Sequence, residues 1–431
     1  MKKLLAATII LVAATLIACR RQESAPLAGG GSQSGGGPVT INIWTLVPDL
    51  VDASIPAFER DYPNIKIERL SFNSVDVPIK VQQSLAAGLE MPDIVPLEIS
   101  QRAELLEMDI WENLEQAPYN LRKDMFIDYS IPLVQNSRGE IIGIDESLMP
   151  TGMAYKKELT RQYLGTDDRA ALESMFRSLD DFVTRGAEVS RASGGRVFMF
   201  SNPQSILLWT ANANPTKLVD NDGSINFTGK IRDGIDFLIK LRDVNAVDAL
   251  ELWSPQDDAS YAANNHIFYN MPPWGIQDLI KANNPNGQGR WGLMIPPTGP
   301  HSWGGTVWSI YKGSKHKAEA WEYLKRLFLT REGAELCKRT YNFITSVKEF
   351  YNDPSFTSNL DPFFGFDTGN YFMLDLVPKV ASFTFTRYDQ YFVDAISNVG
   401  IYVMSNRSVT LQQALANGIE EMRSRVSVPV R

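Results

Sequence analysis

The chain has 431 residues, with 42 Lys and Arg against 50 Asp and Glu, and a formal net charge of −8. Loss of an N-terminal segment that carries Lys2 and Lys3 would bring this charge to −10. A net charge of this sign argues against nucleic acid as a partner and against a basic membrane-binding face.

The first residues have the pattern of an export signal. Lys2 and Lys3 precede an apolar run over residues 4–17, which ends at Ala18 and Cys19. The run is too short for a membrane-spanning helix, so residues 1–18 are predicted to be a signal peptide. A cysteine at the first mature position resembles the lipobox of bacterial lipoproteins, which implies lipidation of Cys19. The alternative is a plain secretory signal followed by an incidental cysteine.

The next segment separates this signal from the body of the chain. Residues 19–38 are rich in Gly and Ser and predict a flexible linker. The remaining length of about 390 residues exceeds one ordinary core, so we expect two domains. No later segment is apolar enough to span a membrane. Cys337 is the only cysteine of the body, so no disulfide is expected there, and its apolar neighbour indicates a packed thiol rather than a nucleophile.

The body opens with alternating strands and helices. The periodicity predicts strands over 39–44, 65–70 and 93–97, and helices over 51–60 and 77–88. The second helix is expected to stop at Gly88. This order indicates a parallel sheet.

The rest of the body mixes helices and strands. A turn over 220–223 predicts a strand over 224–227, and residues 231–243 predict an amphipathic helix. A strand is expected over 308–311 and an apolar helical stripe over 320–328. Thr410 and Gln413 fit a capping box ahead of a final helix.

Several segments together resemble the extracellular solute-binding proteins of ABC transporters, family 1, typified by maltose and other sugar-binding proteins. The resemblance is carried, in the family's order, by residues 56–67 (PAFERDYPNIKI), 85–95 (LAAGLEMPDIV), 153–159 (MAYKKEL), 303–305 (WGG) and 314–328. Each motif is weak alone, but their order and spacing cover nearly the whole body. Two departures are Asp145, where many members have proline, and residues 266–274, which match the family only loosely.

The resemblance implies an α/β, periplasmic-binding-protein-like fold of type II, with two α/β lobes around a ligand cleft. Lobe I would comprise residues 39–148 plus 304–355, and lobe II residues 152–300 plus 360–431. It also implies a monomeric receptor, facing the periplasm or the cell exterior, that closes on a solute and delivers it to ABC transporter permease subunits.

Aromatic residues are the first candidates for the site, because a sugar presents flat C–H faces to aromatic rings. The chain has nine tryptophans, of which Trp308 and Trp321 fit core positions. Trp44 stands at the end of the first strand, where ligands bind in open α/β sheets. Trp274 and Trp303 lie on expected loops beside proline or glycine, and Trp209 is a further candidate. Core packing is the alternative for each.

Polar candidates follow strand ends or glycines. Glu98 and Asp145 come directly after predicted strands, and Arg387 lies in an aromatic-rich C-terminal stretch. Hydrogen bonds with charged partners suit the hydroxyls of a mono- or oligosaccharide. Gly304 and Gly305 allow positive φ and close approach of the backbone. Surface charge and a simple turn are the alternatives.

Two other classes of protein fit part of the pattern. A lipid-anchored glycoside hydrolase would use paired carboxylates, for which Glu98 and Asp145 are candidates. A passive surface adhesin would need no cleft. The sequence has no nucleophile-elbow or phosphate-loop motif, and its three histidines show no metal-ligand spacing, so no enzyme, cofactor or metal is expected.

Overall fold

The computed structural model describes residues 37–98, 105–381 and 385–431. The predicted signal peptide, Cys19 and nearly all of the predicted linker lie outside these residues. None of the helices in the described ranges has the length and apolar character that a membrane crossing requires.

The first sheet has the strand order β2-β1-β3-β10-β4. Its strands are β1 (Val39–Thr45), β2 (Ile65–Ser71), β3 (Ile94–Glu98), β4 (Ile144–Asp145) and β10 (Thr306–Ile310). Strand β1 pairs in parallel with β2 and β3, as the sequence predicts. Strand β10 arrives from far along the chain and pairs antiparallel with β3 and β4.

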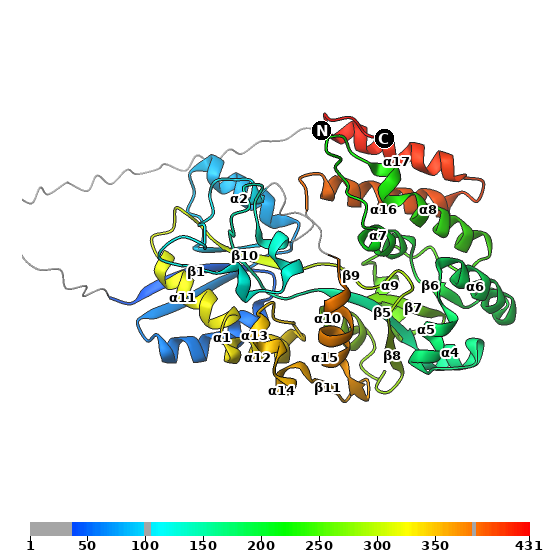
Figure 1. Ribbon diagram of the computed structural model, residues 1–431, viewed down its shortest axis with the longest axis horizontal. Coiled ribbons are helices and arrows are strands. Elements are labelled where there is room, and N and C mark those ends of the chain that lie inside the picture. Colours follow the sequence, from blue (N-terminus) through cyan, green and yellow to red (C-terminus); the bar gives the residue numbers. More distant parts are fainter. Residues whose placement is uncertain (1–36, 99–104, 382–384) are drawn as a thin grey trace, which may run out of the picture. The chain divides into compact units, whose positions relative to one another are not determined.

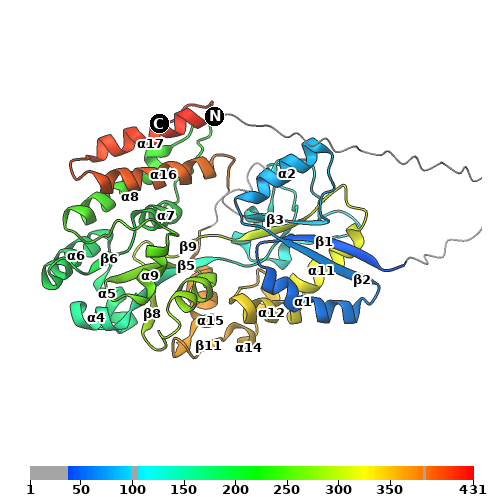
Figure 2. The same cartoon turned by 180° about the vertical axis from the view of Figure 1, so that it is seen from behind.

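Helices cover both faces of the first sheet. They are α1 (Pro48–Asp61), α2 (Asp76–Ala87), α11 (Lys317–Phe328) and α12 (Arg331–Tyr341). Figure 2 shows α2 on one face and α1 with α11 on the other. Helix α2 stops at Gly88, whose φ of 62° gives the predicted left-handed cap.

The shorter elements that join or extend these parts are η1 (Lys123–Met125), η2 (Asp128–Val134), α13 (Lys348–Tyr351), α14 (Pro354–Thr357), β11 (Leu360–Asp361) and β12 (Phe366–Asp367). Strands β11 and β12 pair only with each other in the described part of the chain.

The second sheet has the strand order β6-β7-β5-β8, and β9 also pairs with β5. Its strands are β5 (Pro150–Lys156), β6 (Phe198–Phe200), β7 (His266–Met271), β8 (Trp291–Met294) and β9 (His301–Ser302). The central strand β5 runs antiparallel to β7, β8 and β9, and β6 runs parallel to β7.

The helices that lie between β5 and β8 along the chain are α4 (Lys157–Leu164), α5 (Arg169–Met175), α6 (Leu179–Ser193), α7 (Pro203–Ala213), α8 (Phe227–Asp243), α9 (Pro255–Ala262), α10 (Pro273–Gly275) and the π-helix η3 (Ile276–Lys281). The C-terminal elements are α15 (Thr368–Asn370), the π-helix η4 (Tyr371–Leu376), η5 (Val377–Lys379), α16 (Asp389–Ser405) and α17 (Leu411–Arg425). Helices α16 and α17 lie side by side next to α8 (Figure 1).

One predicted strand is wrong, and one predicted cap is confirmed. Residues 224–227 form no continuous strand. Ile225 alone makes β-bridges, to Val219 and Val430, and the Asn226 side chain accepts a hydrogen bond from the Gly229 backbone and starts α8 at Phe227. The predicted helix over 231–243 is therefore one turn longer at its start. Thr410 and Gln413 form the expected capping box of α17.

The second sheet separates two hydrophobic cores. Ala154 and Leu293 belong to a core shared with the first sheet, whereas their neighbours Met153 and Met294 belong to a core with α6, α7 and α8. Side chains alternate between faces along each strand, so both faces of this sheet are buried. Trp308 and Trp321 are 0% and 8% exposed, which confirms their predicted core positions.

Three segments connect the two sheets and bind one another through their backbones. The Glu146 N–H donates to Thr306 O at 2.9 Å, and the Trp303 N–H donates to Met149 O at 3.2 Å. The third segment joins through the Leu148 N–H, which donates to Ile344 O at 2.7 Å. These hydrogen bonds fix the register of residues 146–149 against 303–306.

Candidate functional site

Three tryptophans from separate segments contact one another. Trp253 precedes α9, Trp274 lies in α10, and Trp303 lies between β9 and β10. Their ring centroids are 5.8 Å apart for Trp253 and Trp274, 5.9 Å for Trp253 and Trp303, and 5.5 Å for Trp274 and Trp303. We call them the tryptophan cluster. The structure thus brings together two of the predicted platforms and adds Trp253, which the sequence did not single out.

Local backbone geometry explains how the cluster forms. Pro272 and Pro273 end β7 and start α10, so Trp274 lies on a short helix rather than on the predicted loop. Gly304 and Gly305 have φ values of 89° and 114°, which confirms the expected positive φ at both glycines. A Cβ at Gly304 would lie 3.1 Å from the Trp274 Nε1 atom. The glycine therefore lets the backbone approach the indole.

The strands that lead into the cluster end in buried polar side chains. Asn270 lies four residues before Trp274, and His301 and Ser302 directly precede Trp303. The side-chain polar atoms of these three residues find no hydrogen-bond partner among the residues that the structure describes. Burial lowers the pKa of His301 to about 3 and keeps its ring neutral. Buried polar atoms without a partner are costly, which makes them candidates for ligand contacts.

A second aromatic group lies at the carboxyl edge of the first sheet. Trp44, near the end of β1, contacts Phe72, which directly follows β2, with ring centroids 4.7 Å apart. Glu98 is the last residue of β3 and is half-buried. The carboxyl ends of parallel strands meet at one edge of a sheet, where ligands of open α/β sheets bind. Phe72 was not predicted as a site residue, although it directly follows a predicted strand.

Two acids from separate elements interact through their charges. Asp49 lies in the first turn of α1 and Asp278 lies in η3. Asp278 stays accessible to solvent, yet the protein around it partly desolvates its carboxylate. This desolvation, with the charge of Asp49, raises the pKa of Asp278 to about 6. This pair could not be predicted from the sequence, because the two residues are distant along the chain.

Asp145 and its neighbour Glu146 occupy buried positions. Asp145 lies within β4 rather than after it, is 5% exposed, and lines a small cavity with Ser130 and Ser346. The Trp308 Nε1–H donates to Glu146 at 2.9 Å. Burial raises the pKa of Glu146 to about 7. Glu146 was not predicted as a site residue, although an acid within an apolar segment is a signal that could have identified it.

The remaining predicted contacts lie apart from the tryptophan cluster. Trp209 is 1% exposed, packs among phenylalanines including Phe182 and Phe237, and donates from Nε1 to Thr298 at 2.9 Å. It lies in α7 and is part of the core. Arg387 is exposed. Cys337 is buried, and burial raises the pKa of its thiol. This burial confirms the prediction that the Cys337 thiol is packed in the protein interior.

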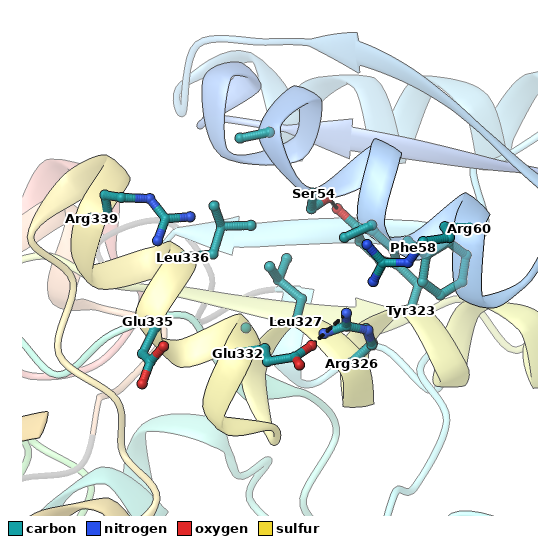
Figure 3. Close-up of a pocket in the computed structure, with 13 residues that line it drawn as sticks. Ser54, Phe58, Arg60, Tyr323, Arg326, Leu327, Glu332, Glu335, Leu336 and Arg339 are labelled. Carbon is teal, nitrogen blue, oxygen red and sulfur yellow. Dashed lines mark hydrogen bonds and ion pairs between the residues drawn. The ribbon is translucent and has the colours of Figure 1, made fainter.

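A larger cavity lies elsewhere, between α1, α11 and α12. It has a volume of about 340 Å³ and an apolar floor that includes Phe58 and Leu327. The hydroxyls of Ser54 and Tyr323, which both line it, lie 2.9 Å apart, and Arg326 forms an ion pair with Glu332 (Figure 3). None of the predicted site residues lines this cavity. No group of three or more His, Cys, Asp or Glu in the described ranges could hold a metal ion.

A family model decides the class of protein. Residues 53–362 match the model of bacterial extracellular solute-binding proteins. The chain belongs to this family. Its members bind solutes rather than transform them, so the expectation of a binding protein instead of an enzyme is confirmed. The glycoside hydrolase alternative for Glu98 and Asp145 is set aside.

Individual relatives agree with this membership. The lactose-binding protein of Rhizobium radiobacter is 21% identical over 303 residues, which cover 67% of this chain and 70% of that protein. The crystal structure of an extracellular solute-binding protein of family 1 has a TM-score of 0.77 at 20% identity, covering 90% of this chain and 99% of that one.

Two further similar proteins have been solved in complex with a sugar or a sugar-like ligand. The galacto-N-biose-/lacto-N-biose I-binding protein of Bifidobacterium longum, in complex with lacto-N-biose, has a TM-score of 0.73 at 17% identity and covers 92% of this chain and 100% of that one. The GacH receptor of Streptomyces glaucescens, also solved with acarbose, has a TM-score of 0.72 at 16% identity, with coverage of 90% and 98%. At these identities the likeness confirms the fold, two α/β lobes of the solute-binding type.

Proposed function

We propose that this solute-binding protein captures a carbohydrate, and that the tryptophan cluster is the main contact surface for the sugar. The observation that carries the proposal is the convergence of Trp253, Trp274 and Trp303 from three separate segments, with Trp253 still 53% exposed. Aromatic faces match the C–H faces of sugar rings. The lactose-binding relative and the lacto-N-biose complex support a carbohydrate over other solutes.

Polar groups beside the aromatic rings would bind the hydroxyls. Asn270, His301 and Ser302 are buried and without partners in the described ranges, and Asp49 and Asp278 supply carboxylate acceptors. A hydrogen bond to a charged group contributes about 1.5–3 kcal/mol. Glu98 and Trp44 are proposed contacts on the side of the first sheet. Trp209 is left out of the proposed site because its ring is buried in the core.

The ligand would bind between two lobes with the predicted bounds, residues 39–148 plus 304–355 and residues 152–300 plus 360–431. The hydrogen bonds between residues 146–149 and 303–306 mark two of the segments where closure would bend the chain. Ligand contacts from both sides would favour the closed state.

Delivery to a permease and attachment through Cys19 complete the proposal. Family membership supports a receptor outside the cytoplasm, and a lipid on Cys19 with a Gly- and Ser-rich leash would keep the receptor close to a membrane transporter. Mass spectrometry of the mature N-terminal peptide tests this step. A diacylglyceryl group on Cys19 supports it, and an unmodified Cys19 in the exported protein contradicts it.

A ligand screen tests the sugar itself. Purified protein is heated with mono- and oligosaccharides, polyols and amino acids, and co-purified ligand is identified by mass spectrometry. We expect a raised melting temperature with at least one carbohydrate, because a ligand that binds the native state stabilises it. A shift with amino acids alone would contradict the proposal.

A further inference from the structure

Trp253 has a backbone conformation that a bulky side chain rarely adopts. Its φ is 68°, in the left-handed region that favours glycine. The residue directly precedes Ser254, the N-cap of α9, so the chain turns sharply there. Strained backbone persists only where surrounding structure holds it, and it gathers at functional sites. The strained turn at Trp253 therefore needs stabilising contacts from the surrounding structure.

The buried carboxylate of Asp257 supplies such contacts. It is 2% exposed and accepts hydrogen bonds from Ser201 Oγ and Asn202 Nδ2, each at 2.9 Å. The backbone N–H of Trp253 further stabilises its charged form. The Asp257 N–H in turn donates to the N-cap oxygen of Ser254 at 3.2 Å. One carboxylate thus joins the turn at Trp253 to the segment after β6.

That segment is itself rigidly held. Asn202 caps α7, since its Oδ1 accepts from the Ser205 N–H at 2.8 Å. The loop that leads to Trp253 is tied to the same place, because the Leu250 N–H donates to Ser201 O at 3.2 Å. Asp257 therefore links the segment after β6, at Ser201 and Asn202, to the turn that carries the exposed Trp253 indole.

We propose that Asp257 is a positioning residue, which holds Trp253 in its left-handed turn so that its indole forms the outer wall of the tryptophan cluster and contacts the sugar ring. The inference rests on the proposed function for its ligand, but the positioning itself does not need one. Trp253 lies at 28° to Trp274 and 37° to Trp303. Loss of this link would free the turn and tilt the indole away from both partners.

Fluorine NMR of ligand-free protein tests the positioning. The protein is labelled with 5-fluorotryptophan, and the Trp253 resonance is assigned by its loss in Trp253→Phe. We expect Asp257→Asn to shift or broaden this resonance while leaving that of Trp44 in place. The matched control is Asp258→Asn, which removes the same charge from the next residue of α9 and should move neither. Ser201→Ala removes a single donor and provides a milder variant that keeps the carboxylate. An unmoved Trp253 resonance in both Asp257→Asn and Ser201→Ala overturns the proposal.

Sugar titration then tests the consequence for binding. We expect Asp257→Asn to raise the Kd at least threefold for a carbohydrate found by the screen, and to have no further effect in the Trp253→Ala background. An equal loss in both backgrounds would show that Asp257 acts on the fold rather than through Trp253. If wild-type protein binds no carbohydrate, the proposed function fails, and the NMR result still decides the role of Asp257.

Discussion

The two sides of the candidate site are built in different ways. On the first sheet, Trp44 and Glu98 lie at the ends of β1 and β3, where the order of parallel strands places them. Beside the second sheet, Trp253, Trp274 and Trp303 meet through a strained turn, a proline-started helix and two glycines at positive φ. Regular topology forms the first group, whereas long-range packing of irregular segments forms the second.

This difference suggests a division of roles. The tryptophan cluster offers more aromatic surface, and Trp274 and Trp303 pack against different cores, so the cluster belongs to both hydrophobic units. The pair of Trp44 and Phe72 is smaller and lies beside a carboxylate. We expect the cluster to carry most of the affinity and the first sheet to contribute the smaller share.

The largest expected effect concerns two buried titratable groups with opposite behaviour. Glu146, beside β4, has a raised pKa of about 7, so its native state keeps a proton that the unfolded chain loses above about pH 4.5. His301, in β9, has a lowered pKa of about 3, so its unfolded state gains a proton below about pH 6.5. Between pH 4.5 and 6.5 the contributions of these two groups have opposite signs and offset each other in the wild type.

Single variants should reveal each slope. Relative to the wild type, the slope of the free energy of unfolding against pH in Glu146→Gln should become more positive by about 1.4 kcal/mol per pH unit over this window, because the contribution of His301 is no longer offset. In His301→Gln the slope should become more negative by about the same amount, because the contribution of Glu146 is no longer offset. Urea denaturation at pH 4.5, 5.5 and 6.5 measures both. Parallel curves for the wild type and both variants would contradict the assignments.

The next effect separates the tryptophan cluster from the rest of the chain. Trp274→Ala and Trp303→Ala should each weaken carbohydrate binding about tenfold, or about 1.4 kcal/mol, because each removes an aromatic face. Calorimetric titration measures the change, and Trp274→Phe, which keeps a smaller ring, should lose less. Unchanged Kd values in both alanine variants would refute the platform roles.

Close backbone approach at Gly304 should matter for binding as well as for stability. Gly304→Ala places a methyl group 3.1 Å from the Trp274 indole and strains a φ of 89°, so we expect a loss of about 1 kcal/mol in unfolding free energy and weaker sugar binding. Gly223→Ala is the matched control, because its φ is 82° and its added Cβ meets nothing within 4 Å. Equal sugar affinity in the two variants would argue against a role for this contact.

The smallest effect is expected on the first sheet. Trp44→Ala should raise the Kd about threefold, or about 0.7 kcal/mol, since half-buried Trp44 offers less free surface to a ligand. Fluorescence titration of Trp44→Ala beside Trp274→Ala measures the ratio. A loss at Trp44 as large as that at Trp274 would reverse the proposed division between the two sides.

The same division explains what the sequence predicted. The run from β1 to β3 was predictable because its contacts are local and its helices end in recognisable signals such as Gly88. The antiparallel pairing of β10 was not, since it depends on a return of the chain after two hundred residues or so of other structure. The strand expected over 224–227 was wrong because the side chain of Asn226 caps a helix.

The site divides in the same manner. Trp274 and Trp303 were predictable from their proline and glycine neighbours, but Trp253 was not, because its strained φ and its interaction with Asp257 appear only in the folded chain. Asp49 and Asp278 likewise approach each other only through tertiary packing. Asp145 followed a predicted strand, yet its carboxylate is buried beside Ser130 and Ser346.

Calorimetric titration of the wild type and of a Trp253→Ala, Trp274→Ala, Trp303→Ala triple variant, each with the carbohydrates that raise the melting temperature, is the most direct measurement. We predict saturable binding of at least one carbohydrate to the wild type, and a Kd at least a hundredfold higher in a triple variant that still unfolds cooperatively. Carbohydrate binding of equal strength in both proteins would contradict the assignment of the tryptophan cluster as the sugar site.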